Sequence, residues 1–144
     1  MHTRKATAFD AVEIKELIDS YVEAGLLLPR TEEFIVSNAH HFIVAVDENR
    51  RIVGCVHLDE YAPSIAELRS LAVAPNTQGK GVGRTLVDGT ERFARSRGYA
   101  TLFAVSNDEA FFRRFGFEPR QIPELDRERS EVSKYKGVYA KDIG

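Results

Sequence analysis

The stretch that decides the fold is Gln78-Gly79-Lys80-Gly81-Val82-Gly83-Arg84. It follows a β-rich run that Pro75 and Asn76 end, and it precedes an amphipathic helix expected to reach Arg97. Glycines let the backbone approach an anion closely, and the start of a helix offers unpaired N–H groups at the positive end of the helix dipole. The stretch therefore predicts a cradle for a pyrophosphate, to which Lys80 and Arg84 add positive charge.

Other phosphate-binding motifs fit this stretch poorly. The pattern GxxxxGKS/T is absent from the sequence, and the dinucleotide pattern GxGxxG fails because Arg84 stands where its third glycine would be. Judged from the glycines alone, a tight turn that binds nothing is an equal alternative. The position between a strand and a helix, rather than the glycines themselves, favours the anion cradle.

Outward from this turn, strands and helices alternate along the chain. Strands are expected at residues 3–6, 41–47, 52–58, 66–73 and 100–105, from Phe117, and at 135–141. Helices are expected from Asp10 to Gly25, after Thr31, from the glycine turn to Arg97, and at 108–115. Strands that follow each other without a helix form antiparallel pairs, whereas the strand–helix–strand unit over residues 66–105 forms a parallel pair. The sequence therefore predicts one α/β domain over residues 1–144 with a mixed sheet.

Three local signals mark the ends of the first two helices. Asp10, with Glu13 three positions later, is typical of a capping box. Gly25 is placed to end the first helix, and Thr31 is placed to cap the second. Residues 26–30 are thus expected to connect the two helices.

Two motifs resemble the GNAT acetyltransferase superfamily. Val73-Ala74-Pro75 followed by Gln78, Gly81 and Gly83 is similar to its coenzyme A signature, and Ala110-Phe111-Phe112 followed by Gly116-Phe117 is similar to its second motif. The interval between the motifs and the order of strands also agree, so the resemblance covers nearly the whole chain. It implies a single GNAT-type domain in which a mixed, mostly antiparallel sheet is flanked by helices and two central parallel strands splay apart.

The resemblance also implies acetyl-coenzyme A as the cosubstrate. Backbone groups of residues 79–84 would hold its pyrophosphate. The strand through Leu71, Ala72 and Val73 would pair with its pantetheine arm like an added strand. The slot left where this strand splays from residues 100–105 would take the thioester.

The chemistry calls for a base, because an amine must lose a proton to attack a thioester. Glu67 stands early in the strand that leads to the turn, where the family often places a carboxylate that works through water. A structural glutamate paired with Arg69 is the alternative, and His57 is a minor rival as the base. For the oxyanion, the resemblance implies a backbone N–H near Leu71 to Val73.

Phe112 departs from the family pattern, because many relatives carry a tyrosine there that can protonate the leaving thiolate. Phenylalanine cannot donate a proton, but a thiol pKa of about 8.5 makes the thiolate a tolerable leaving group near neutrality. The sequence does not select a substitute among the other tyrosines considered: Tyr61, Tyr99, Tyr135 and Tyr139. The change also fits a domain that binds acetyl-coenzyme A without catalysis.

A narrower resemblance addresses the acceptor. The segment Gly25-Leu26-Leu27-Leu28-Pro29-Arg30 is similar to part of the acetyltransferase domain of N-acetylglutamate synthase, as are Ile52-Val53-Gly54-Cys55, the run Glu67 to Val73 and the phenylalanine at 112. It implies that Arg30 pairs with a substrate carboxylate, for which a planar guanidinium is well suited. An arginine that is merely solvated beside a helix start is an equal alternative.

The segment before the expected last strand fits the resemblance to the N-acetylglutamate synthase domain less well. Lys134 or Lys136 could hold a carboxylate where that subfamily tends to carry an arginine and a serine. The expected acceptor is therefore the amine of a small molecule, an amino acid such as glutamate, with a role in arginine biosynthesis. A protein or peptide amine, and a non-catalytic acetyl-coenzyme A sensor, remain the alternatives.

Composition and net charge limit the classes of function that remain possible. The 144 residues carry a net charge of −2, so no basic field draws the chain to nucleic acid or to an anionic membrane. Cys55 is the only cysteine, and no signal-peptide core or membrane span is evident, so a cytoplasmic location is expected. His40 and His41 would point to opposite faces of a strand, which argues against a metal site. A homodimer is expected only because many members of the family dimerise.

Overall fold

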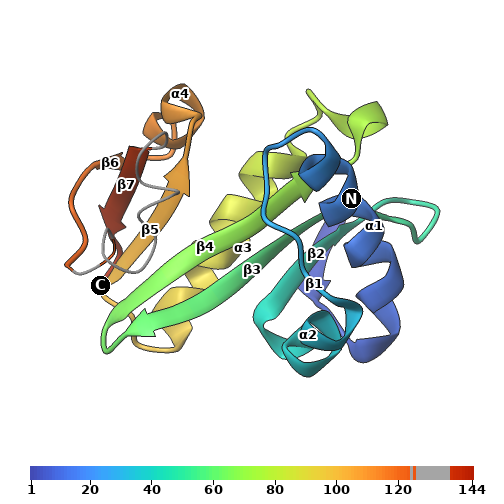
Figure 1. Cartoon of the computed structure of the whole chain (residues 1–144), viewed down its shortest axis with the longest axis horizontal. Helices are drawn as coiled ribbons and strands as arrows, with labels where there is room; N and C mark the ends of the chain where they lie inside the picture. The colour runs from blue at the N-terminus through green and yellow to red at the C-terminus, as the bar shows by residue number, and fades with distance from the viewer. Residues whose placement is uncertain (124, 126–136) are drawn as a thin grey trace.

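The computed structural model describes residues 1–123, 125 and 137–144 of the chain. Its strands are β1 (His2–Lys5), β2 (Phe42–Val46), β3 (Ile52–Ala62), β4 (Ile65–Val73), β5 (Thr101–Ser106), β6 (Glu118–Pro119) and β7 (Gly137–Asp142). Its α-helices are α1 (Ala11–Glu23), α2 (Glu32–Ser37), α3 (Val82–Ser96) and α4 (Glu109–Arg113), with 3₁₀ turns at Ala8–Asp10, Ala39–His41 and Pro75–Thr77. The described strands form one sheet in the order β1-β2-β3-β4-β5-β7-β6 (Figure 1).

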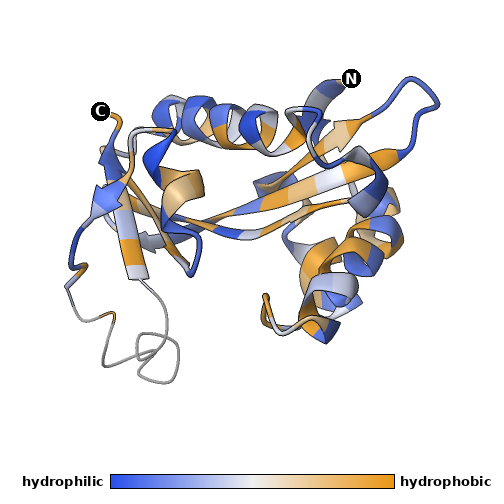
Figure 2. Ribbon diagram, turned by 90° about the horizontal axis from the view of Figure 1, so that it is seen from above, coloured by the Kyte–Doolittle hydropathy of each residue, from blue (hydrophilic) through white to orange (hydrophobic). Residues whose placement is uncertain are grey.

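Helices cover both faces of this sheet (Figure 2). On one face lies α3, whose expected apolar positions are all buried: Val82, Leu86, Val87, Thr90, Phe93 and Ala94. On the other face lie α1 and α2, where Ile14, Ile18 and Ile35 share a core with Phe42 and Val44 of β2. All five residues of β2 are buried because side chains on both of its faces meet a helix layer.

The parallel neighbours β4 and β5 pair over only a few residues. Pairing joins residues 65–67 to residues 101–103, whereas β4 continues to Val73 and β5 to Ser106. The register between β3 and β4 shifts near Ser70, whose φ of 54° is left-handed. A bulge of this kind bends the strand that carries it. The mixed sheet with splayed central parallel strands is thereby confirmed.

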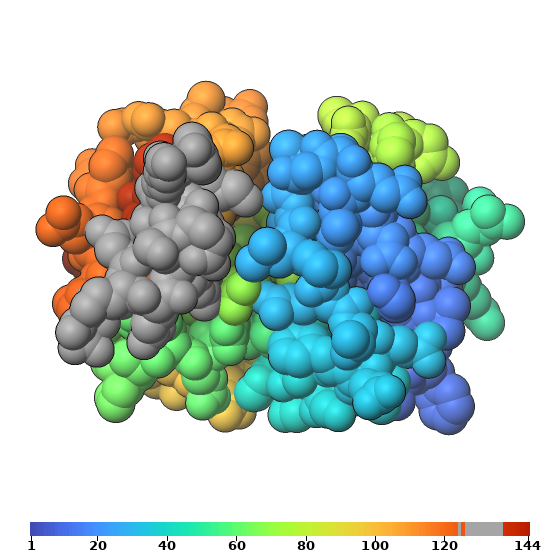
Figure 3. Space-filling view, viewed as in Figure 1, coloured from blue at the N-terminus to red at the C-terminus, as the bar shows by residue number. Residues whose placement is uncertain are grey.

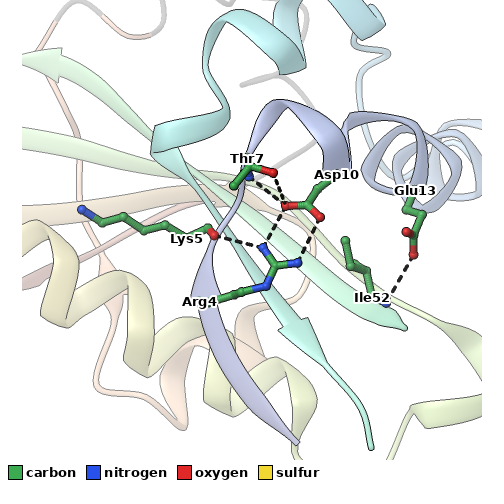
Figure 4. A network of polar contacts seen from close by, with 6 residues as sticks. All are labelled: Arg4, Lys5, Thr7, Asp10, Glu13 and Ile52. Carbon is green, nitrogen blue, oxygen red and sulfur yellow. Dashed lines mark hydrogen bonds and ion pairs between the residues drawn. The ribbon is translucent and has the colours of Figure 1, made fainter. Parts of the chain in front are cut away.

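Asp10 joins β1 to the start of α1 (Figure 4). Its carboxylate accepts hydrogen bonds from the two terminal nitrogens of Arg4, at 2.8 and 3.0 Å, and from the backbone N–H of Thr7 at 2.8 Å. Glu13 instead accepts from the backbone N–H of Ile52 at 3.4 Å. The expected capping box between Asp10 and Glu13 is therefore wrong. Asp10 closes a box that begins at Thr7, because the chain enters α1 through a 3₁₀ turn.

We expect Asp10→Asn to lower the free energy of unfolding by about 1–2 kcal/mol at neutral pH, since a neutral amide loses the charged hydrogen bonds to Arg4 and Thr7. The hydrogen bonds from Arg4, followed by that from Thr7, hold the pKa of the Asp10 carboxyl below its usual range. A lowered pKa stabilises the fold above the unfolded-state pKa, and this stability is lost as the pH falls through the folded-state value.

Denaturant unfolding at neutral and at acidic pH measures this effect. The difference between Asp10→Asn and the parent chain should shrink toward acid, and Glu16→Gln, on an exposed position of α1, serves as the control. A difference that does not change with pH would contradict the assigned role of the carboxylate.

The adjacent histidines do not lie in a strand. His40 and His41 belong to the 3₁₀ turn before β2, and their ring centroids are 4.2 Å apart, so the expectation that they point to opposite faces is wrong. The alternation of side chains between two opposite faces holds for a strand and not for a 3₁₀ turn, which has three residues per turn. Within the described ranges, no group of three or more His, Cys, Asp or Glu side chains is placed to hold a metal ion. In the same ranges, no helix is both long enough and apolar enough to cross a membrane.

Candidate active site

A cavity of about 780 Å³ opens where β4 and β5 part. Its walls come from the segment after α1, from β4, from the glycine turn, and from the end of β5 with α4. Figure 3 shows the segment after α1 in light blue across from α4 in orange. Most of the residues expected in the site line the cavity: Arg30, Glu67, Leu71, Val73, Gln78, Gly79, Gly81, Val82, Gly83 and Arg84.

Two other expected residues are not among those that line this cavity. Ala72 is fully buried in the core beneath α1 because successive side chains of a strand point to opposite faces. Lys80 lines a separate, smaller hollow together with Asp47 and Glu48. Lys134 and Lys136 lie outside the described residues.

The glycine turn presents open backbone groups at the start of α3. Gly79 and Gly81 have φ values of 85° and 79°, in the left-handed region that glycine adopts without strain. The backbone N–H of Thr85 donates to the carbonyl of Gly81 at 3.0 Å, as in a first helical hydrogen bond. The N–H groups of residues 82–84 precede that bond and have no acceptor within the helix. No acidic side chain occurs in this first turn, so the positive end of the helix dipole is not neutralised locally.

On the face of the sheet beneath α1 and α2, charged side chains of β3 and β4 meet. Glu67 is only 2% exposed, and Nε of Arg69 lies 3.8 Å from one of its carboxylate oxygens. The other side of Arg69 contacts Asp59, at 3.2 Å from Nη1. The antiparallel register sets Asp59 directly opposite Glu67, and like charges in that position repel unless a cation lies between them. Arg69 supplies that cation, so Glu67 has both the contact expected of a structural glutamate and a place in the cavity wall.

The pKa values of His57 and Cys55 argue against catalytic roles for both residues. His57 is a weak proton acceptor, and Cys55 is a poor nucleophile. Burial is the largest cause that lowers the pKa of His57, to about 4, and the charges of Arg30 and Arg69 lower it further against the opposing effect of Asp59. Its ring stacks on that of Phe42 and is not part of the cavity wall. Burial raises the pKa of the Cys55 thiol to about 12, so the thiolate needed for nucleophilic attack is scarce at neutral pH.

Residues 11–117 match the family model described as the Acetyltransferase (GNAT) family. The chain belongs to this family. It is 33% identical over 115 residues to an uncharacterized N-acetyltransferase of Chlorobaculum tepidum, which covers 80% of this chain and 74% of that protein. The GNAT acetyltransferase expected from the two motifs is thereby confirmed.

Two larger proteins extend this comparison. The amino-acid acetyltransferase of Pseudomonas fluorescens is 33% identical over 135 residues, 92% of this chain and 31% of that protein. The crystal structure of N-acetylglutamate synthase from Neisseria gonorrhoeae, complexed with coenzyme A and N-acetylglutamate, superimposes with a TM-score of 0.89 at 27% identity, over 99% of this chain and 35% of that one. The GNAT chain described here therefore spans about a third of the length of either protein.

Tyr21 is a cavity residue that the sequence did not reveal. Its hydroxyl donates to the carbonyl oxygen of Val73 and accepts from the N–H of Val73, both at 3.1 Å. The side-chain nitrogen of Gln78 lies 3.5 Å from the same hydroxyl. A pantetheine arm that pairs with Val73 must therefore replace this hydroxyl. The only sequence signal was the position of Tyr21 in the last turn of the first helix, just before the segment 25–30.

The Phe112 ring lines the cavity wall of this GNAT chain and is buried. It is nearly parallel to the ring of Tyr139, with centroids 6.3 Å apart, and Tyr139 itself is not in the cavity wall. Tyr61 and Tyr99 are also absent from that wall, and the hydroxyl of Tyr61 donates to the carbonyl of Pro123 at 2.7 Å. Tyr135 lies outside the described residues. Among the described tyrosines, Tyr21 is the one that lines the cavity.

Arg30 is held in the cavity wall by contacts along its length. Its guanidinium carbon lies 4.9 Å from the ring centroid of Phe34, and its carbonyl oxygen accepts a hydrogen bond of 3.1 Å from Lys15 of α1. The side chain is partly buried rather than freely solvated. A planar guanidinium that stacks on an aromatic ring is of the residue type that recognises a planar anion such as a carboxylate.

Proposed function

We propose that this GNAT acetyltransferase moves the acetyl group of acetyl-coenzyme A to the amine of a small carboxylated acceptor, an amino acid such as glutamate, by direct attack. One observation carries the proposal: a single cavity joins the open N–H groups of the glycine turn to Glu67 and Arg30. The similarity to amino-acid acetyltransferases and to the synthase complexed with N-acetylglutamate supports the choice of acceptor.

Acetyl-coenzyme A would contact three neighbouring parts of the cavity along its length. The N–H groups at the start of α3 would bind the pyrophosphate, since a helix N-terminus favours an anion. The backbone N–H and carbonyl of Val73, which are hydrogen-bonded to the hydroxyl of Tyr21, would exchange this partner for the pantetheine arm. The thioester would then lie where the pairing of β4 with β5 ends, beyond Glu67 and Phe103. A backbone N–H near Leu71 would stabilise the oxyanion.

Transfer would then proceed in one addition and one elimination. Glu67 accepts a proton from the acceptor ammonium through water, and the neutral nitrogen attacks the thioester carbonyl carbon. The C–S bond breaks as the carbonyl re-forms, coenzyme A leaves as a thiolate, and the second proton lost by the nitrogen passes through water to this thiolate. An ordinary thiol pKa of about 8.5 lets it leave without the tyrosine that Phe112 replaces. Arg30 would hold the acceptor carboxylate.

Phe112 also favours a second candidate, a domain that binds acetyl-coenzyme A without turnover. The two candidates share the glycine turn and differ in the reaction. Turnover on any amine therefore separates them, and a protein or peptide amine as the acceptor is tested in the same assay.

A thiol-release assay with acetyl-coenzyme A and a panel of free amino acids, polyamines and a peptide amine tests the proposal. We expect turnover on glutamate or a close analogue and a rise of about 10- to 100-fold in the acceptor KM for Arg30→Gln, since a charged hydrogen bond to the carboxylate is lost. Arg92→Gln, an exposed position on α3, is the control. Turnover only on the peptide, or bound acetyl-coenzyme A without turnover, would overturn the amino-acid acceptor.

A further inference from the structure

The charged side chains around Glu67 form a chain of contacts across β3 and β4. Arg69 donates a hydrogen bond from Nη1 to Oδ2 of Asp59 at 3.2 Å, whereas its Nε lies 3.8 Å from Oε2 of Glu67, beyond hydrogen-bond distance. Glu67 and Arg69 line the cavity, and Asp59 is not among the residues that line it. The guanidinium is therefore hydrogen-bonded to the carboxylate behind the cavity wall and only approaches the carboxylate that belongs to this wall.

Strand register explains why one guanidinium meets both carboxylates. Glu67 and Arg69 are two residues apart on β4, so their side chains share a face of the sheet. On β3, Asp59 lies opposite Glu67, and His57 lies opposite Arg69. Asp59 is thus the diagonal neighbour of Arg69 and within reach of its long side chain. A guanidinium makes its strongest pair when two parallel N–H groups meet one carboxylate, so Asp59 and Glu67 compete for this arrangement.

The other elements around Glu67 carry few further charges. On β5, the register partner of Glu67 is Phe103, which is apolar. On β3, His57 is neutral at neutral pH, because burial lowers its pKa to about 4. Arg30 lines the same cavity from the segment before α2, and its carbonyl oxygen accepts a hydrogen bond from Lys15 of α1. Of the described charged groups, Arg69 is in ion-pair contact with Glu67, and Asp59 shares this cation.

We propose that Asp59 is a positioning residue that keeps the guanidinium of Arg69 turned away from Glu67, so that the Glu67 carboxylate acts as the proton acceptor. This inference rests on the proposed function, in which a proton passes from the acceptor ammonium through water to Glu67. The N–H bond breaks as an O–H bond forms on Glu67, while Asp59 and Arg69 stay ionised. A carboxylate in a two-point pair with a guanidinium takes up a proton less readily, whereas one that faces a second carboxylate without a cation retains it.

Profiles of kcat against pH, with both substrates saturating, test this inference, because the acidic limb reports the base in the enzyme–substrate complex. In Asp59→Asn the guanidinium should turn to Glu67, so kcat should fall about tenfold at alkaline pH and less at acidic pH. In Arg69→Gln the two carboxylates face each other, so kcat should stay near that of the parent chain at alkaline pH and fall about tenfold at acidic pH. The double variant removes one charge of each sign, so its kcat relative to the parent chain should change little with pH.

Two further variants separate the charge effect from damage to the fold. Arg69→Lys keeps the positive charge and should restore the acidic rates that Arg69→Gln loses. Arg97→Gln is the matched control, since Arg97 pairs with Glu60, the residue next to Asp59 on β3, and is not part of the cavity wall. The side chain of Asp59 is 35% exposed, so Asp59→Asn should fold, and its thermal unfolding midpoint checks this.

The outcomes separate this inference from the proposed function. Profiles of parental shape in both single variants, including a fall in kcat by one factor at every pH, would overturn the inference, because Asp59 and Arg69 would then serve only the fold. An acidic limb that persists in Glu67→Gln would overturn Glu67 as the base. A limb that is lost in Glu67→Gln but does not move in Asp59→Asn or Arg69→Gln would overturn the positioning role of Asp59 alone.

Discussion

Glu67→Gln is expected to lower kcat by about 10²- to 10³-fold while the affinity for acetyl-coenzyme A stays near that of the parent chain. The amide keeps the shape of the side chain in its buried place but cannot accept the proton of the acceptor ammonium. The glycine turn, which would bind the cosubstrate, belongs to another part of the cavity wall and is not altered. Steady-state kinetics over a range of pH, with calorimetry of acetyl-coenzyme A, measures the two effects separately.

The control is Glu60→Gln. Glu60 lies on the neighbouring strand β3, is exposed and pairs with Arg97 away from the cavity, so the same change of charge should leave turnover unaffected. Full activity of Glu67→Gln at every pH would remove Glu67 as the base. Glu67 would then be left with its structural role beside Arg69 and Asp59.

Gly81→Asp is expected to weaken acetyl-coenzyme A binding by about 100-fold or more, since it sets a carboxylate at the start of α3 against an incoming pyrophosphate. Open space surrounds the position, so the new side chain meets no protein atom within 4 Å of its Cβ. The left-handed φ of 79° costs a non-glycine residue about 1–2 kcal/mol, which a stable fold can absorb. Calorimetry measures the loss, and the thermal unfolding midpoint shows whether the chain is still folded.

Gly98→Asp separates the charge in the turn from backbone strain. Gly98 follows the other end of α3, has a φ of 84° and likewise has no atom within 4 Å of an added Cβ. It is not part of the cavity wall, so this variant should carry a similar strain and bind acetyl-coenzyme A normally. Normal affinity of Gly81→Asp would exclude the glycine turn as the pyrophosphate site.

Several features that depend on residues close together in the chain were predicted correctly from the sequence. The hydroxyl of Thr31 caps α2 by accepting the N–H of Phe34 at 3.0 Å, as its position before the helix indicated. The apolar spacing of α3 corresponds to its buried face. Errors occurred at the cap of the first helix, where the box begins at Thr7, and where the length of an element depends on its pairing partner. β3 was expected to end at residue 58 and runs to Ala62, because Asp59 and Glu60 pair with β4.

The sequence by itself determined the order of elements, the glycine turn between a strand and a helix, and through these the family. All of these depend on residues that are neighbours in the chain, so spacing and residue type suffice to predict them. Only the tertiary structure decided which side chains meet in the cavity. The contact of Tyr21 with Val73 spans 52 residues. The guanidinium of Arg84 in α3 lies over the ring of Phe115, which follows α4 in the chain. Such contacts follow from strand register and from the splay of β4 and β5, which packing over the whole domain sets.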